Sequence, residues 1–211
     1  MKTNNLIALI VQDVPVRSHL NHLLQQATIA AVLIAAIAFF SVIGFRTDID
    51  TAIDTGRFLF KFVIAIALAV SGGLVMFRIG KPGLSLRLQT WGLLLPLILA
   101  VGAAAFEVSV MPSSTWAVRM IGHNSRLCLT IIPALSLGPL ACFIVALRHG
   151  APSKPVLAGA AAGLMSAGIA ATFYAANCDD DSPLFVLLWY PVAISAVVAT
   201  GAFLGHNLLR W

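Results

Sequence analysis

Long runs of apolar residues constrain this chain more than any other feature of its sequence. Six such runs begin near residues 27, 57, 90, 124, 155 and 182. A helix needs about 20 mostly apolar residues to cross a hydrocarbon core of roughly 30 Å. The chain is 60% hydrophobic and only 10% charged, whereas soluble domains carry about 25% charged residues. The sequence predicts an all-α integral membrane protein with six transmembrane helices joined by short connections.

The predicted domain organisation is simple. Residues 27–211 form the six-helix transmembrane domain, and residues 1–26 form a short cytosolic helical segment. No basic start, short apolar run and small-residue cleavage site precede residue 27, so we expect the first span to be retained. The net charge is +5, but the basic residues stand singly at the ends of spans. We therefore expect a lipid bilayer around the protein and no direct contact with nucleic acid.

Orientation is predicted from lysine and arginine in the connections. Of the 13 basic residues, eight fall on the side of both termini and five on the opposite side. Six of the eight acidic residues also fall on that opposite side. Both termini are then cytoplasmic, in a multi-pass membrane protein, and the acidic loops face outside.

The stretch NCDDDSPLFVLLWY places Cys178 in a short outer loop, beside three aspartates. Cys128 begins the fourth span at a similar depth, whereas Cys142 lies about 21 Å deeper along the same helix. A disulfide requires Cα atoms within about 7 Å, so Cys142 cannot pair with Cys128 and is predicted to be a packing residue. Cys128 and Cys178 could form a structural disulfide, remain separate thiols, or act as a sensor pair. A soft-metal site with His123 and Asp179 is a further alternative, although the spacing matches no standard zinc motif.

Polar residues inside the spans are few. Glu107 lies near the outer end of the third span, where we expect it to pair with Arg119 or Arg126. Lys61 can extend outward from the second span. The fifth span carries small residues at four-residue intervals, which is typical of a close helix contact: Gly159, Gly163, Ala167 and Ala171.

No HExxH, P-loop, GxSxG or CxxC motif occurs in the sequence. We therefore predict no catalytic residues, no resident cofactor and no enzymatic activity. Two other functions remain open from the residues alone. The first is a small cation transporter or channel using Glu107 and the acidic loops, and the second is a quinone-linked thiol oxidoreductase using Cys128 and Cys178.

The N-terminal segment carries an apolar stripe spaced for a short helix, which ends before a proline. A second helix is expected from Val16 into the membrane. Because few basic residues surround the stripe, a groove on a protein partner fits it better than an anionic lipid surface. The predicted partner-binding residues are Leu6, Leu9, Ile10, Asp13, Val14 and Pro15.

The whole chain resembles the NrsF-type membrane anti-sigma factors. The resemblance rests on LIALIVQDVPVR at the start, Cys128, Cys178, the run NCDDDSPLFVLLWY and the closing LLRW, in this order with six spans. It implies that the N-terminal segment holds an extracytoplasmic-function sigma factor at the membrane. It also implies that the outer cysteines are sensor thiols for a stress such as a heavy metal or an oxidant. The heavy metal would be a transient ligand of these thiols. Cys142 departs from the two-cysteine pattern.

Overall fold

The computed structural model describes residues 16–79, 91–150 and 152–210. Within these ranges every regular element is a helix. The long helices are α2 (Val16–Val42), α4 (Gly56–Ile79), α6 (Leu94–Val110), α8 (Ser125–Arg148), α9 (Pro155–Ala175) and α10 (Pro183–Leu208). The short ones are α3 (Ile49–Ala52), the 3₁₀ turn η1 (Ser113–Thr115) and α7 (Trp116–Ile121).

Each of the six predicted runs forms a helix, which confirms the all-α fold class. Five helices in the described part of the chain are long and apolar enough to cross a membrane: α2, α4, α8, α9 and α10. The remaining one, α6, has 17 residues and rises about 25 Å, which is less than the roughly 30 Å hydrocarbon thickness. A sixth span therefore stays a prediction.

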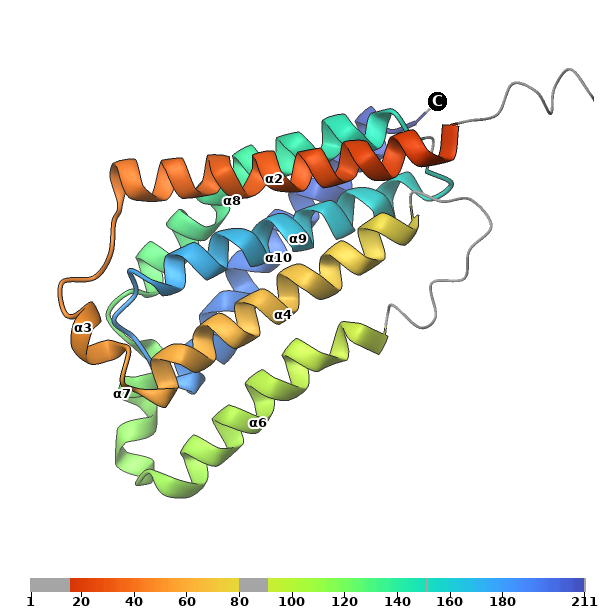
Figure 1. Cartoon of the computed structure of the whole chain (residues 1–211). Helices are drawn as coiled ribbons and strands as arrows, with labels where there is room; N and C mark the ends of the chain where they lie inside the picture. The colour runs from red at the N-terminus through yellow and green to blue at the C-terminus, as the bar shows by residue number, and fades with distance from the viewer. Residues whose placement is uncertain (1–15, 80–90, 151, 211) are drawn as a thin grey trace, which may run out of the picture.

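The long helices run side by side, so the bundle has two ends (Figure 1). We call the end with the connections 43–55, 111–124 and 176–182 the loop end. The opposite end, where α2 begins and α10 finishes, is the terminal end. Helix α2 begins at Val16, as expected, and runs without a break through residue 26, so it joins the predicted N-terminal segment to the bundle.

Helix α9 occupies the centre of the bundle and contacts α2, α4, α8 and α10. Its most apolar window is 67% buried, against 28% for α2. Small side chains make this position possible because they let neighbouring backbones approach closely. Helix α6 is peripheral: it packs on α4 and α10, and it diverges from the other long helices in Figure 1.

The small-residue stripe of α9 makes the close contact that its spacing predicts. A Cβ added to Gly159 would lie 2.1 Å from the carbonyl oxygen of Gly201 on α10, and one added to Gly163 would lie 2.7 Å from that of Val197. The opposite face of α9 is equally close to α4, since a Cβ on Gly168 would lie 2.5 Å from the backbone nitrogen of Ala69.

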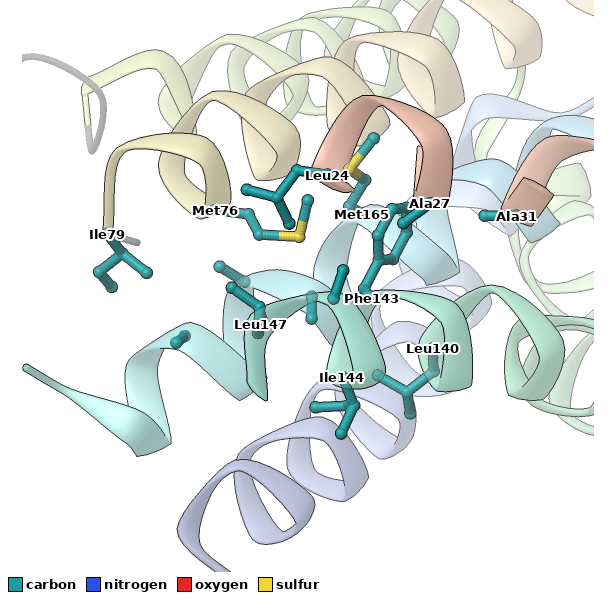
Figure 2. Close-up of a cluster of buried hydrophobic side chains, with 14 of the residues drawn as sticks. Leu24, Ala27, Ala31, Met76, Ile79, Leu140, Phe143, Ile144, Leu147 and Met165 are labelled. Carbon is teal, nitrogen blue, oxygen red and sulfur yellow. The ribbon is translucent and has the colours of Figure 1, made fainter. Parts of the chain in front are cut away.

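Two hydrophobic clusters fill the bundle, one toward each end. The cluster at the terminal end is shown in Figure 2, where side chains from α2, α4, α8 and α9 meet. Leu24, Met76, Phe143 and Leu147 are fully buried there. Cys142 packs against this cluster, far from the other two cysteines, as the sequence predicts.

Candidate functional site

Two buried thiols lie together at the loop end. Cys128 is on the first turn of α8 and Cys178 is in the connection between α9 and α10. Both are at most 1% exposed, and both belong to the hydrophobic cluster at this end, with Tyr174 and Tyr190. All three cysteines of the chain are free thiols. The structure thus brings the two predicted sensor residues into one buried cluster, in the reduced state.

The loop that carries Cys178 is held by a buried lysine. The Nζ atom of Lys61 donates a hydrogen bond of 2.8 Å to the carbonyl oxygen of Cys178. The same amine forms a 2.6 Å ion pair with Asp181. Lys61 thus extends toward the loop end, as predicted, but it is only 2% exposed and its charge is paired inside the protein. A buried lysine requires such a partner, because an unpaired charge away from water is very costly.

An arginine binds the same loop from the other side. The Arg46 guanidinium pairs with Asp181 at 2.9 Å and with Asp48 at 2.6 Å, and it donates a 3.3 Å hydrogen bond to the carbonyl of Cys178. The hydrogen bond from Arg46 lowers the pKa of Asp48 and raises the pKa of Arg46 itself. Arg46 and Asp48 are therefore both charged at neutral pH.

Two further bonds attach this loop to the end of α2. The backbone nitrogen of Arg46 donates to the carbonyl of Ala176 at 3.2 Å. The Nδ2 atom of Asn177 donates to the carbonyl of Gly44 at 3.2 Å. Gly44 and Arg46 follow directly after α2, which ends at Val42. The loop with Cys178 is therefore bonded to the helix that leads to the N-terminal segment.

Asp180 connects the same loop to the start of α8. Its Oδ2 atom accepts hydrogen bonds from the backbone nitrogens of His123 at 2.8 Å and Asn124 at 2.7 Å. Gly122 makes this approach possible: its φ is +60°, and a Cβ there would lie 2.7 Å from Asp180 and 2.5 Å from the ring of Phe185. One aspartate of the triplet thus fixes the turn that precedes Cys128.

Glu107 is buried and fully engaged. Its Oε1 atom lies 3.0 Å from Arg119 and 3.7 Å from Arg57, and its Oε2 atom accepts a 2.6 Å hydrogen bond from Ser182. The predicted pairing with Arg119 is confirmed, whereas Arg126 is exposed on α8. These partners explain why a carboxylate can be buried here, without a role in transport. They also join α6 to the start of α10.

Burial in the apolar cluster raises the pKa of the Cys178 thiol, and the positive charge of Lys61 opposes that effect only in part. The thiol donates a weak hydrogen bond of 3.8 Å to the carbonyl of Asp180. Because the thiolate is the nucleophile and the metal ligand, the protonated and buried Cys178 is held in an unreactive form.

The predicted soft-metal ligands are not gathered around one point. The His123 ring is 87% exposed and lies 3.7 Å from Asp180, while Asp179 accepts a hydrogen bond from the Asn124 side chain. Over the residues that the structure describes, no three His, Cys, Asp or Glu side chains are placed to hold a metal ion. A metal site thus stays a prediction without geometric support in this state.

The sequence missed the roles of Lys61 and Arg46. A lone lysine inside an apolar run, opposite a loop of aspartates, is the one signal that could have indicated the buried pair. The candidate partner-binding residues at the N-terminus lie outside the described residues: Leu6, Leu9, Ile10, Asp13, Val14 and Pro15.

Fold and site together define a class: an apolar helical bundle that keeps reduced thiols and paired charges at one end. Comparison with known proteins narrows this class. The family "NrsF: Negative regulator of sigma F" matches residues 10–211, and the chain belongs to this family.

Two curated relatives are similar over most of their length. The "Anti-sigma-F factor NrsF" of Caulobacter vibrioides is 33% identical over 168 residues, which is 79% of this chain and 78% of the relative. The "Probable anti-sigma-F factor NrsF" of Azospira oryzae is 27% identical over 177 residues, covering 84% and 83%. No solved structure matches the chain. Membership implies a regulatory role, with a sigma factor as the partner.

Proposed function

We propose that this protein is a membrane anti-sigma factor that holds an extracytoplasmic-function sigma factor through residues 1–26. A heavy metal or an oxidant, sensed by Cys128 and Cys178, releases the sigma factor. The protein lies in a bacterial inner membrane with both termini in the cytoplasm, so that the loop end faces the periplasm. Family membership supports the regulatory role, and the placement of basic residues supports the orientation.

One observation carries the sensing part of the proposal: the loop with Cys178 is bonded to Gly44 and Arg46, in the connection that directly follows α2. Helix α2 extends from that loop to Val16, beside the predicted partner-binding residues. A change at the thiols can therefore reach the N-terminal segment through one continuous helix.

In this proposal, the signal changes the bonding of the two sulfur atoms, and this change alters the orientation of the Cys178 backbone. A peroxide would convert the two thiols to a disulfide and be reduced to water, whereas a soft metal would displace both thiol protons. Either event needs the sulfur atoms to converge, which turns the Cys178 peptide. Its carbonyl accepts hydrogen bonds from both Lys61 and Arg46, so this rotation weakens the attachment of the loop to α4 and α2.

A signal can bias two states only if it interacts with them differently. In the state described here the thiols are buried and protonated, and the loop is fully bonded. In the proposed released state the thiols are joined, through a bond or a metal, and the loop has left Lys61 and Arg46. The signal shifts the equilibrium because it binds to, or reacts with, the released state more favourably than the described state.

The first test is co-purification. The protein is tagged at its C-terminus, extracted in mild detergent, and compared with a variant that lacks residues 1–26. We expect the intact protein to retain a sigma factor and the truncated variant to retain none. A sigma factor that stays bound equally to both forms would contradict the role of the N-terminal segment.

The second test concerns the thiols. Cys128→Ser and Cys178→Ser are expected to retain the sigma factor when cadmium or peroxide is added, while the parent protein releases it. Cys142→Ser is the matched control, because this thiol belongs to the other hydrophobic cluster, and it should respond like the parent. Full release from both sensor variants would rule out thiol sensing and leave the anti-sigma function standing.

A further inference from the structure

We propose that the seam between α4 and α6 binds one anionic phospholipid, with an acyl chain in the seam and the head group against Arg57. This inference rests on the chain spanning a membrane and not on the identity of its protein partner.

Two cavities follow one another beside α6, each with a volume of about 460 Å³. The second lies between α4 and α6, whereas the first is lined by α4, α6, α9 and, for half of its lining residues, α10. Along α4, Ile64 lines the first cavity and Phe60, one turn away, lines the second. Along α6, Ala100 lines the first cavity and Ala103 lines the second. Each volume is within the range of roughly 300–1,000 Å³ that is common for small-molecule sites.

The lining of the first cavity is mostly apolar. Apart from Ser195 and Tyr190 it consists of aliphatic residues and prolines, with leucines from four helices around it. Among the described residues, α6 makes its main helix contacts with α4 and α10, and the lining residue Leu97 is 54% exposed, so the cavity reaches the surface of the bundle. Protein interiors are close-packed, and an apolar space open to a bilayer is filled by acyl chains.

The charge at the mouth selects an anionic head group. Arg57 and Glu107 are the charged residues of the second cavity, and the two oxygens of Glu107 are already bound to Arg119 and Ser182. Arg57 reaches Glu107 only at 3.7 Å, and within the described residues its guanidinium donates no hydrogen bond. Two arginines thus face one carboxylate, which leaves a net positive charge.

Arg57 is also accessible, since its side chain is 43% exposed beside the apolar mouth of the cavity. Its planar donors match a phosphate oxygen pair, and in the head-group layer each such cation contributes about 1 kcal/mol toward anionic lipid. A zwitterionic lipid offers the same acyl chain without the net charge, so it should occupy the seam more weakly.

The test uses the full-length protein in mild detergent and native mass spectrometry. The probes are phosphatidylglycerol and phosphatidylcholine with identical acyl chains, added at equal concentration. We expect the parent protein to retain phosphatidylglycerol about five-fold better, and Arg57→Gln to lose that preference. Arg126→Gln removes an exposed arginine at the same end, outside the seam, and should keep the preference.

A second variant tests the acyl-chain part. Ala103→Trp fills the seam and should reduce retention of both lipids at least five-fold. Gly102→Trp is the matched control, because nothing lies within 4 Å of a Cβ at Gly102, and it should bind like the parent. Glycerol 1-phosphate, which has the head-group chemistry without tails, should not displace the lipid.

Three results would overturn the proposal. The first is an equal loss of preference in Arg57→Gln and Arg126→Gln, which indicates a diffuse charge effect. The second is unchanged lipid retention in a folded Ala103→Trp protein. The third is displacement by glycerol 1-phosphate, which indicates an anion site that needs no acyl chain.

Discussion

At the scale of single residues, the carbonyl oxygen of Cys178 is the most informative atom of the site. It accepts hydrogen bonds from Lys61 at 2.8 Å and from Arg46 at 3.3 Å, and both donors are also paired with Asp181. Charge-assisted hydrogen bonds of this kind are stronger than neutral ones. The position of the Cys178 thiol is thus set by its backbone and by two cations from other elements.

The burial of Cys178 predicts an unusual pH dependence of alkylation. In a Cys128→Ser/Cys142→Ser protein, only Cys178 reacts with iodoacetamide. Because burial raises its pKa and the thiolate is the reactive form, the rate should reach half its maximum well above pH 8.5, the approximate value for a free cysteine. After unfolding in detergent the midpoint should return to about 8.5. A midpoint at or below 8.5 in the folded protein would contradict this account.

Removing the buried lysine should destabilise the loop end. Lys61→Met leaves Asp181 with one cation fewer and the carbonyl of Cys178 with one donor fewer, and deleting one partner of a buried pair costs about 3–5 kcal/mol. We expect a clear decrease in the thermal unfolding temperature in detergent, together with faster alkylation of Cys178. The exposed Lys154 at the terminal end provides the control Lys154→Met, which should leave both quantities unchanged.

At the scale of helices, α9 organises the bundle because both of its faces are lined with small residues. One face meets α10 at Gly159 and Gly201, and the other meets α4 at Gly168 and Ala69. Van der Waals packing of such close backbones is a main source of helix association in lipid. Helix α6 has no comparable contact, which fits its peripheral place.

Enlarging a glycine in this contact should separate the helices. In Gly201→Leu the new side chain begins 2.4 Å from the carbonyl of Gly159, so one backbone must move. Overpacking costs about 1–3 kcal/mol or more, and the unfolding temperature in detergent should fall. Gly102→Leu introduces the same residue into open space on α6 and should leave the unfolding temperature within a degree or two of the parent. Equal decreases in both variants would show that the close contact with Gly159 is not the cause, since leucine has the higher helix propensity at both sites.

The helices were predictable because apolar runs of fixed length have few alternatives in a bilayer. The contact at Gly159 and Gly163 was predictable for a similar reason, since a four-residue interval marks one helical face. The partners of Lys61 and Arg46 were not predictable. Cys178 and Asp181 lie in a loop, and their distance along the chain from the two cations carries no periodic signal. Asp181 is 135 residues from Arg46.

At the scale of the whole molecule, the two ends of the bundle differ in kind. The terminal end holds a cluster of mostly aliphatic and aromatic side chains, whereas the loop end combines thiols with six ion-paired side chains around Cys178 and Glu107. Helix α2 contacts both clusters, with Leu24 in one and Phe39 in the other. A perturbation at the loop end therefore acts on a helix that is packed against both clusters.

If the loop end holds α2 in the state that binds the sigma factor, then loosening that end should release the partner without any signal. Arg46→Gln removes the ion pairs to Asp48 and Asp181 and weakens the bond to Cys178, but keeps a polar side chain that can donate hydrogen bonds. A coupling of 1–3 kcal/mol shifts a two-state equilibrium by about 5–150-fold, so transcription from a sigma-dependent reporter should rise at least five-fold in unstressed cells. Arg126→Gln, at the same end but exposed, should leave the reporter at its basal level, with both variants present in the membrane in equal amounts. Basal reporter activity in an equally abundant Arg46→Gln protein would show that α2 holds its partner without help from the Cys178 loop, and the signal would then have to reach the N-terminal segment through another helix.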